Sequence, residues 1–466
     1  MCRLRESSLF LWLLTILLVS SCVPSLAPAH PIALPDESFA WSVSAAISPN
    51  GARHYVFDQC DSDACKIAYY RAHGGNPFLR LEITPSPPFY GFYRYYLYPD
   101  IAVTDDDQVF VVWYVGGASN HTIINGILYA SIVTDTVSID SVTNLAMVSR
   151  QPPKVIARGT YVYAVYAMYD GVEGLQWRYR QLQPLDAEGN IGGSDTVYAS
   201  RPQLGIDSQG DLHAVYRLTD GSKQTIAYWK TGTISETILA ITENNEQHLI
   251  LPDMVLDPDD TAHVVVGITT TTGISLAILS LALSPTAPIT TEIPLTNTLQ
   301  PWSLYGQPHL VNGIPYTSYV TETMGVPAMT GITSTLVVFS AKNSELSEPE
   351  IWVYSPRHTS LMRITNNAWA DGEPLITSVD HAPVIGWRTI DGSGCQRDVY
   401  TWDTIHGIRQ IHTSASTDAC HRGYALVGQG KWGSGIWIDS LSDDDDTAVP
   451  WVVFNAYRTY LPIIQR

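Results

Sequence analysis

Charged residues are scarce in this chain, and basic residues are the scarcest of them. Only 15% of the 466 residues are charged, and 26 Lys and Arg stand against 45 Asp and Glu, which gives a formal net charge of −19. A surface of this sign repels a phosphate backbone. The composition therefore argues against a nucleic-acid partner.

Familiar catalytic signatures are also missing. The sequence contains no HExxH, GxSxG or GxxxxGK[ST] motif, which removes the usual signals for a zinc protease, an α/β-hydrolase and a P-loop enzyme. Residues 428–433 match GxGxxG, but no βαβ unit surrounds them. No cofactor is predicted.

Long apolar runs are confined to the start of the chain. Arg3 and Arg5 precede the apolar stretch 9–19, which is short for a membrane span and typical of an export signal. Val19-Ser20-Ser21-Cys22 resembles a bacterial lipobox, so residues 1–22 are predicted to be a signal peptide with Cys22 as the lipidated residue. Cleavage after Ala29, which would release a soluble protein, is the alternative. Residues 23–40 are rich in proline and are predicted to form a tether.

Four cysteines remain after Cys2 and Cys22, and an even number in an exported chain favours disulfides. We expect Cys60 to pair with Cys65 and Cys395 with Cys420. A zinc site is the alternative, but no CxxC pair supports it.

One phrase recurs along the rest of the chain. YPDIAVTDDDQVFVVWY (98–114), RPQLGIDSQGDLHAVY (201–216) and LPDMVLDPDDTAHVVVG (251–267) each contain a proline, a short apolar strand, an Asp- or Gly-rich turn and a second apolar strand. The anchoring prolines lie 49 to 66 residues apart, at Pro99, Pro153, Pro202, Pro252, Pro308 and Pro374. Such a period is typical of a propeller or a solenoid.

Each repeat has room for four short strands. In the fourth unit these are 203–206, 212–218, 225–230 and 236–241, separated by turns such as Ser208-Gln209-Gly210. The sequence therefore predicts an all-β fold, a β-propeller of four-stranded antiparallel blades over residues 41–466. Eight blades are counted, and seven is the alternative. The last blade lacks a clear fourth strand, which either 459–464 or an N-terminal strand near 32–34 could supply.

This pattern resembles the sialidase-like, BNR-type propellers of exported bacterial proteins. The Asp-box of that family is absent, because the equivalent turns read Ser48-Pro-Asn-Gly, Asp207-Ser-Gln-Gly and Asp257-Pro-Asp-Asp. The Tyr–Glu nucleophile pair of sialidases has no counterpart by motif. The resemblance implies the fold and not the activity.

Propeller topology places the loops between strands 2 and 3 on the same face as the connections between blades. The side chains predicted to bind a ligand on that face are aromatic, basic and acidic, a mixture typical of sugar recognition. They are Tyr93, Arg94, Tyr95, Arg217, Trp302, Glu322, Arg388, Asp439 and Trp369. For Arg217 and Arg388, contacts between blades are an equal alternative.

Other polar residues have structural interpretations. The strand-end aromatics Trp113, Tyr166, Tyr216, Tyr319 and Trp387 recur at one repeat position and are predicted to pack between blades, and His213 and His263 are predicted to be core or strand-edge residues. Residues 105–107 and 257–260 are interpreted as solvated charge in turns. Asp58, Asp61 and Asp63 could offer oxygens to Ca²⁺, but no full ligand set is visible.

The sequence thus predicts an exported, lipid-anchored propeller of the cell envelope that binds a glycan or a protein. A carbohydrate-active enzyme, either a glycosidase or a polysaccharide lyase with its site on the same face, is the alternative. A structural scaffold is the third possibility, and fold alone does not choose among them.

Overall fold

The computed structural model describes strands and their connecting turns. The described residues are 25–26, 30–31, 39–60, 65–72, 79–83, 93–119, 122–143, 148–149, 151–169, 175–184, 187–192, 198–220, 223–233, 236–242, 247–270, 273–281, 289–293, 303–304, 309–315, 333–342, 346–355, 360–379, 382–390, 396–403, 407–413, 421–429, 432–440 and 448–456. All regular elements within these ranges are β-strands, which confirms the all-β prediction.

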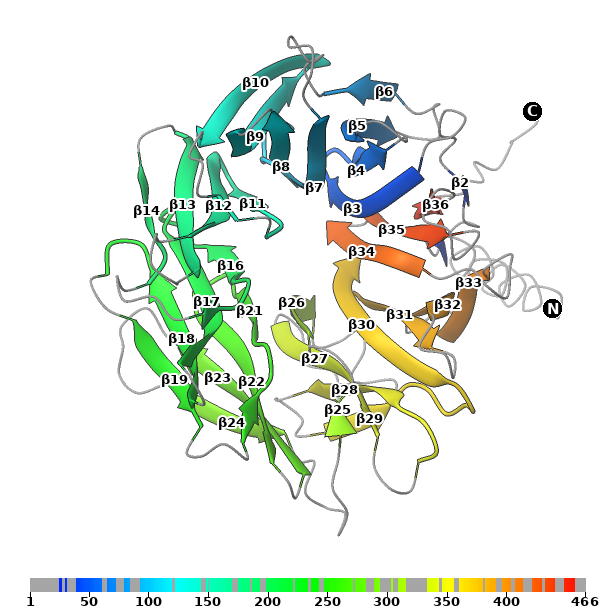
Figure 1. Cartoon of the computed structure of the whole chain (residues 1–466). Helices are drawn as coiled ribbons and strands as arrows, with labels where there is room; N and C mark the ends of the chain where they lie inside the picture. Colours follow the sequence, from blue (N-terminus) through cyan, green and yellow to red (C-terminus); the bar gives the residue numbers. More distant parts are fainter. Residues whose placement is uncertain are drawn as a thin grey trace, which may run out of the picture.

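The described strands form eight antiparallel sheets of four or five strands each (Figure 1). The first four sheets along the chain consist of β3 (Phe39–Ile47), β4 (Arg53–Cys60), β5 (Cys65–Ala72) and β6 (Leu79–Glu82); β7 (Tyr93–Val103), β8 (Val109–Ser119), β9 (Thr122–Val133) and β10 (Thr136–Thr143); β11 (Lys154–Arg158), β12 (Tyr161–Tyr169), β13 (Leu175–Gln183) and β14 (Glu188–Asn190); β15 (Tyr198–Ala199), β16 (Gln203–Ile206), β17 (Leu212–Asp220), β18 (Lys223–Lys230) and β19 (Thr237–Ile241).

The other four sheets follow the same order of strands. They consist of β20 (His248–Leu249), β21 (Asp253–Leu256), β22 (Ala262–Thr270), β23 (Gly273–Leu281) and β24 (Ile289–Ile293); β25 (Ser303–Leu304), β26 (His309–Pro315), β27 (Thr333–Lys342), β28 (Glu350–Ser355) and β29 (Ser360–Arg363); β30 (Ala370–Val379), β31 (Ala382–Ile390), β32 (Gln396–Asp403) and β33 (Gly407–Thr413); β34 (His421–Gln429), β35 (Trp432–Ser440) and β36 (Ala448–Ala456) with β1 (Ser25–Leu26) and β2 (His30–Pro31).

The sheets are arranged radially around an axis. The innermost strands contact one another around the ring in the order β3, β7, β11, β16, β21, β26, β30 and β34, and β34 contacts β3 again (Figure 1). This arrangement of small antiparallel sheets is a β-propeller. Loops far apart in the sequence therefore lie on a shared rim.

The N-terminal strands complete the last sheet. β1 and β2 both pair antiparallel with β36, with Ser25 opposite Ala456 and His30 opposite Val452. The fourth strand thus comes from the N-terminal side, slightly earlier than the expected 32–34, while 459–464 lies outside the described residues. A free tether over 23–40 was predicted, but parts of it pair with the ring because β36 would otherwise present an open edge.

The repeated prolines mark an interruption of the innermost strands. In β7 and β30 the pairing register shifts between Leu97 and Asp100 and between Gly372 and Leu375, around Pro99 and Pro374. At Pro202 and Pro252 the strand is divided in two, into β15 and β16 and into β20 and β21. Proline has no N–H to donate to a ladder, so it fits at bulges and breaks. Each proline therefore separates a rim segment from the segment that faces the axis.

The turns between strands 1 and 2 have one geometry in four sheets. In each, the first turn residue donates its N–H to the carbonyl four residues later, as from Asp207 to Asp211 (3.0 Å) and from Asp257 to Thr261 (3.0 Å). The fourth turn residue has a positive φ; it is Gly51 or Gly210 in two turns and Asp107 or Asp260 in the others. These turns lie on the face opposite the rim.

Two of these turns also join neighbouring sheets. Asp260 is 5% exposed and accepts hydrogen bonds from the N–H of Ser208 and from Arg158, both at 2.9 Å. The prediction that 257–260 is solvated charge is therefore wrong for Asp260, because the adjacent sheets bring donors onto it. Asp107 similarly accepts a bond from Asn50 at 2.7 Å.

Histidines bridge the turn to the third strand. His213 contacts Asp207 Oδ2 through Nε2 (3.1 Å) and Tyr228 Oη through Nδ1 (2.6 Å). His263 makes the equivalent contacts with Asp257 (3.2 Å) and Ser280 (2.9 Å). These contacts confirm the structural interpretation of both histidines.

The core lies between neighbouring sheets and is rich in strand-2 aromatics. Trp113, Tyr166, Tyr216 and Trp387 are at most 2% exposed, which confirms their predicted packing role; Tyr319 lies outside the described residues. Burying an aromatic side chain contributes about 2–3 kcal/mol. The repeated aromatic position therefore holds each sheet against its neighbours.

Candidate functional site on the rim

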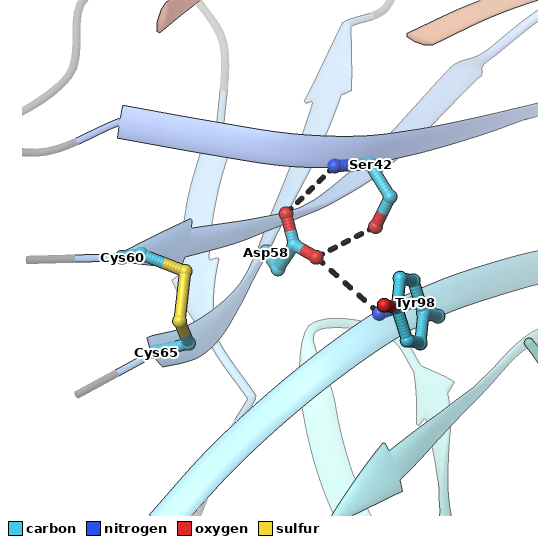
Figure 2. Close-up of a disulfide and its surroundings, with 5 residues drawn as sticks. All are labelled: Ser42, Asp58, Cys60, Cys65 and Tyr98. Atoms are coloured by element: carbon cyan, nitrogen blue, oxygen red, sulfur yellow. Dashed lines mark hydrogen bonds between the residues drawn. A yellow bond between two sulfur atoms is a disulfide. The ribbon is translucent and has the colours of Figure 1, made fainter. Parts of the chain in front are cut away.

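One repeat position at the rim end of strand 2 fixes the connections between sheets. In the first sheet it is Asp58, which is fully buried. Figure 2 shows its carboxylate accepting bonds from the N–H (2.8 Å) and hydroxyl (2.6 Å) of Ser42 and from the N–H of Tyr98 (3.3 Å). Asp58 therefore joins the first sheet to the second, and these bonds use the oxygens that had been considered for Ca²⁺.

The predicted Cys60–Cys65 disulfide is present beside Asp58, at the end of the β4–β5 hairpin (Figure 2). Cys60 is paired in register with Cys65 across the two strands. The bridge is local, so it fixes this hairpin and does not link distant parts of the ring.

Arginines occupy the same repeat position in two other sheets. Arg217 donates to the carbonyl oxygen of Leu249 in the next sheet at 2.6 Å, and burial lowers the pKa of its guanidinium. Arg388 is 5% exposed and forms an ion pair with Glu373. Both arginines therefore make structural contacts on the rim. For Arg217 the contact is between blades, the alternative to ligand binding that the sequence left open; ligand binding by either arginine stays a prediction.

Trp369 is the predicted ligand-binding residue that the structure places in solvent. Its relative exposure is 60%, the highest among the large hydrophobic side chains in the described part of the chain. Its N–H donates to Oδ1 of Asn367 at 2.7 Å, so the backbone beneath the indole is held in place. Trp369 directly precedes β30, in which Gly372 lies opposite Arg388.

Two buried carboxylates lie under this loop. Asp371 is fully buried and accepts bonds from the indole N–H of Trp387 at 3.0 Å and from Asn367 Nδ2 at 2.8 Å. Glu350 is 2% exposed; its Oε1 accepts the N–H of Asn367 at 3.1 Å, and its Oε2 has no hydrogen-bond partner among the residues that the structure describes. Asn367 thus connects both acids to the segment that carries Trp369.

The electrostatics of this pair are unusual. Burial raises the pKa of Asp371 to about 6, and the nearby Glu350 carboxylate adds to this effect, whereas bonds from Thr365, Asn367 and Trp387 oppose it. No ion pair to either acid occurs among the described residues. A carboxyl group with a pKa near neutrality beside an exposed aromatic ring is a candidate functional site.

The sequence reasoning missed Asp371, Glu350 and Asn367. Asp371 could have been noticed because it lies two residues after the predicted Trp369, at the start of β30. Its partner Glu350 comes from the previous sheet, and no spacing in the sequence indicates that contact.

Other predicted residues are only partly placed. Tyr93, Arg94 and Tyr95 lie at the start of β7, and Asp439 lies on β35 opposite His421, but their side chains are not described. Cys22, Trp302, Glu322, Cys395, Cys420, Asp61 and Asp63 lie outside the described residues. The lipidation site and the second disulfide therefore remain predictions.

No group of three or more His, Cys, Asp and Glu side chains suited to a metal ion occurs in the described part of the chain. None of the described elements is a helix long and apolar enough to cross a membrane.

Comparisons with known proteins find similar solved structures but no related sequence. No protein-family model and no curated protein matches the sequence. A protein of unknown function from Dyadobacter fermentans has a similar structure, with a TM-score of 0.41 and 9% identity over 93% of this chain and 99% of that one.

Two further solved structures are similar at the same level. The propeller domain of the trilobed protease of Pyrococcus furiosus has a TM-score of 0.42 and 9% identity, over 82% of this chain and 97% of that one. A sialidase of Trypanosoma rangeli has a TM-score of 0.37 and 8% identity over 92% of this chain, which spans 59% of the sialidase. The resemblance to propellers, sialidases included, is thus one of fold and carries no argument about activity.

Proposed function

We propose that this chain is a surface binding module that holds a glycan or a protein ligand on its rim, at Trp369. The observation that carries the proposal is the 60% exposure of an indole whose backbone is fixed by Asn367. An exposed aromatic ring offers a flat apolar face to the C–H groups of a sugar, and a backbone that is already fixed loses little conformational freedom on binding. Other predicted aromatics and cations, among them Tyr93 and Arg94, would extend the surface.

The test is a glycan-array screen of the detergent-solubilised full chain, with Trp369→Ala compared with the wild type. We expect the wild-type protein to bind glycans on the array and Trp369→Ala to bind the same glycans with an apparent affinity at least tenfold lower. Ile408→Ala is the matched control, since Ile408 is an exposed apolar side chain on the outermost strand β33. Equal binding by wild type and Trp369→Ala would contradict the proposed site.

A carbohydrate-active enzyme is the second candidate, and the acid pair Glu350 and Asp371 is the observation that favours it. Glycosidases require two carboxyl groups with different pKa values, and the raised pKa of Asp371 fits the acid of such a pair. Both groups are buried, however, which favours binding over catalysis. A polysaccharide-degradation screen separates the two functions, because release of reducing or unsaturated sugar would identify an enzyme.

We also propose that the chain is exported and anchored through lipid on Cys22, within a sialidase-like superfamily of propellers. β1 begins three residues after Cys22 and pairs with β36, so the anchor would lie close to the outer edge of the last sheet. Metabolic labelling with an alkyne-bearing fatty acid tests this. Label on the wild type and its loss in Cys22→Ser are expected; equal label on both would contradict it.

We propose that the ring has eight blades, with seven as the alternative. The consecutive contacts of the innermost strands support eight, because each described sheet contributes one of them. An experimental density map of the ring would decide, since seven radial sheets with one sheet packed outside them would contradict this number.

A further inference from the structure

Each repeated proline interrupts the innermost strand of its sheet. The residue directly after the proline lies on the part of that strand that faces the axis of the ring. In four consecutive units these residues are Asp100, Lys154, Gln203 and Asp253, which all carry polar side chains. Arg201 directly precedes Pro202 and reaches the same region. The repeat therefore places a group of charged residues on the inner edge of the ring, away from Trp369.

Asp100 has a structural role in this group. Its Oδ1 accepts a bond from the hydroxyl of Ser44 on β3 at 2.7 Å, and its Oδ2 accepts the N–H of Val155 on β11 at 2.9 Å. Asp100 thus joins three innermost strands, and both of its oxygens already have hydrogen-bond donors.

The two cations contact only neutral acceptors. Lys154 Nζ donates to Oε1 of Gln203 at 3.0 Å, and an Arg201 guanidinium nitrogen donates to the carbonyl oxygen of Pro153 at 3.2 Å. No ion pair of Lys154 or Arg201 occurs within the described residues. Other described cations differ: Lys230 pairs with Asp207 at 2.6 Å, and Arg158 pairs with Asp260 at 2.9 Å.

The two positive groups are close enough to affect each other. The pKa of Lys154 is lowered to about 8, mainly by burial and also by the charge of Arg201, while Asp100 and Asp253 act in the opposite direction. Lys154 is half-buried and Arg201 is exposed, so a solute can reach at least the guanidinium. In a chain of net charge −19, two adjacent cations without a paired carboxylate are a specific feature.

We propose that Lys154 and Arg201 bind a small oxyanion, a phosphate or a carboxylate, on the inner edge of the ring between β11 and β16. An oxyanion would accept N–H bonds from the planar guanidinium and from the ammonium group together. The free N–H donors of both groups suit this geometry, because a guanidinium carries five and an ammonium three. Gln203 would orient Lys154 toward the anion.

The test is calorimetric titration of the full chain with inorganic phosphate and, separately, with acetate, at pH 7. We expect Lys154→Met and Arg201→Met to weaken binding at least tenfold, whereas Lys66→Met and Lys223→Met, at exposed lysines of β5 and β18, leave it unchanged. Stronger binding of one probe identifies the class of anion. An absence of binding by the wild type, or an equal loss in the control variants, would overturn the proposal.

A measurement on the wild-type chain avoids any folding defect of the variants. The rate at which acetic anhydride acetylates Lys154 at pH 8 is followed by mass spectrometry, with Lys230 as the internal reference. We expect the bound probe to slow the acetylation of Lys154 at least threefold and to leave Lys230 unaffected. Equal rates with and without probe would contradict an anion at Lys154.

Discussion

Asp207 and Asp371 are both almost completely buried, yet their surroundings have opposite effects on them. Asp207 lies in a turn on the face opposite the rim and contacts Lys230 at 2.6 Å and His213 at 3.1 Å. Asp371 lies under the rim and receives bonds only from neutral groups of Asn367, Trp387 and Thr365, with Glu350 nearby. Burial raises the pKa of both carboxyl groups, so the partners decide the final direction.

At Asp207 the partners outweigh burial. Bonds from Lys230, from His213 and from the N–H of Asp211 lower its pKa to about 2. His213 is held neutral, because burial lowers its pKa; its Nε2–H donates to Asp207, while Nδ1 accepts the hydroxyl of Tyr228. This cluster stabilises the ring.

At Asp371 the opposite holds, since its pKa is raised to about 6. Two buried carboxyl groups with no cation beside them lower the free energy of unfolding at neutral pH. Groups of this kind concentrate at functional sites. The comparison therefore supports the proposal that the rim near Trp369 binds a ligand, whereas the cluster around Asp207 stabilises the fold.

The largest expected effect comes from removing Asp207. Asp207→Ala leaves Lys230 and His213 without their shared acceptor, so we expect the free energy of unfolding to fall by about 3 kcal/mol at pH 7. The folded pKa lies below the unfolded value, so this stabilisation is complete above about pH 4 and is lost as the pH falls toward 2. Urea denaturation at pH 7 and at acid pH measures both.

Asp211→Ala is the matched control for that prediction. Asp211 also contacts Lys230, at 3.0 Å, but its side chain is 42% exposed, so the loss is expected to stay below about 1 kcal/mol. Equal losses for the two variants would contradict the assignment of Asp207 as the centre of the cluster.

The second effect concerns the two histidines at one repeat position. His213 is 1% exposed, whereas the side chain of His263 is 18% exposed and its bond to Asp257 is longer. We expect His213→Ala to cost about 2 kcal/mol and His263→Ala about 1 kcal/mol of unfolding free energy. Chemical denaturation of both variants under the same conditions measures the two losses of unfolding free energy. A larger loss for His263→Ala than for His213→Ala would show that burial does not determine their size.

The third prediction tests the acid pair through pH. The folded pKa of Asp371 lies above its unfolded value, so its contribution to stability is present below about pH 4 and is lost as the pH rises through 6. Glu350→Gln removes the nearby negative charge and keeps an oxygen for the N–H of Asn367. We expect this variant to be more stable than the wild type by about 1 kcal/mol at pH 7 and no more stable at pH 4.

Glu188→Gln, on the exposed strand β14, is the control for the acid pair. It should change stability little at either pH. A gain for Glu350→Gln that is the same at pH 4 and pH 7 would mean that Asp371 does not titrate between them.

The smallest effect on stability belongs to Trp369. Because its indole is exposed, Trp369→Ala should change the free energy of unfolding by less than about 0.5 kcal/mol while lowering the apparent affinity on the glycan array at least tenfold. Thermal denaturation alongside the array separates the two outcomes. A large loss of stability would show that the indole packs against the ring.

Much of the fold was predictable because the repeat is carried by local chemistry. Prolines at the breaks of the inner strands, turn residues with positive φ and buried strand-2 aromatics all leave periodic signals in the sequence. Trp369 was predictable for the same reason, since topology places every connection between blades on the rim.

The partners of the polar residues were not predictable. For Arg217 and Arg388, ligand binding and contacts between blades were equal alternatives, and the sequence did not indicate that their partners would be Leu249 and Glu373. Asp260 was expected in solvent, but it accepts bonds from two other sheets. The contacts of Arg217 and Asp260 join different blades, whereas Arg388 and Glu373 lie on neighbouring strands of one blade. A single sequence contains no signal for which side chains meet.

Titration of the buried aspartates is the most direct test of the contrast between the two faces. Carbon-13 NMR of carboxyl-labelled aspartate, assigned with Asp207→Asn and Asp371→Asn, should give an apparent pKa of about 2 for Asp207 and about 6 for Asp371. Values that coincide, or an Asp371 that titrates below Asp207, would contradict the contrast between the two buried acids and remove its support for the proposed site at Trp369.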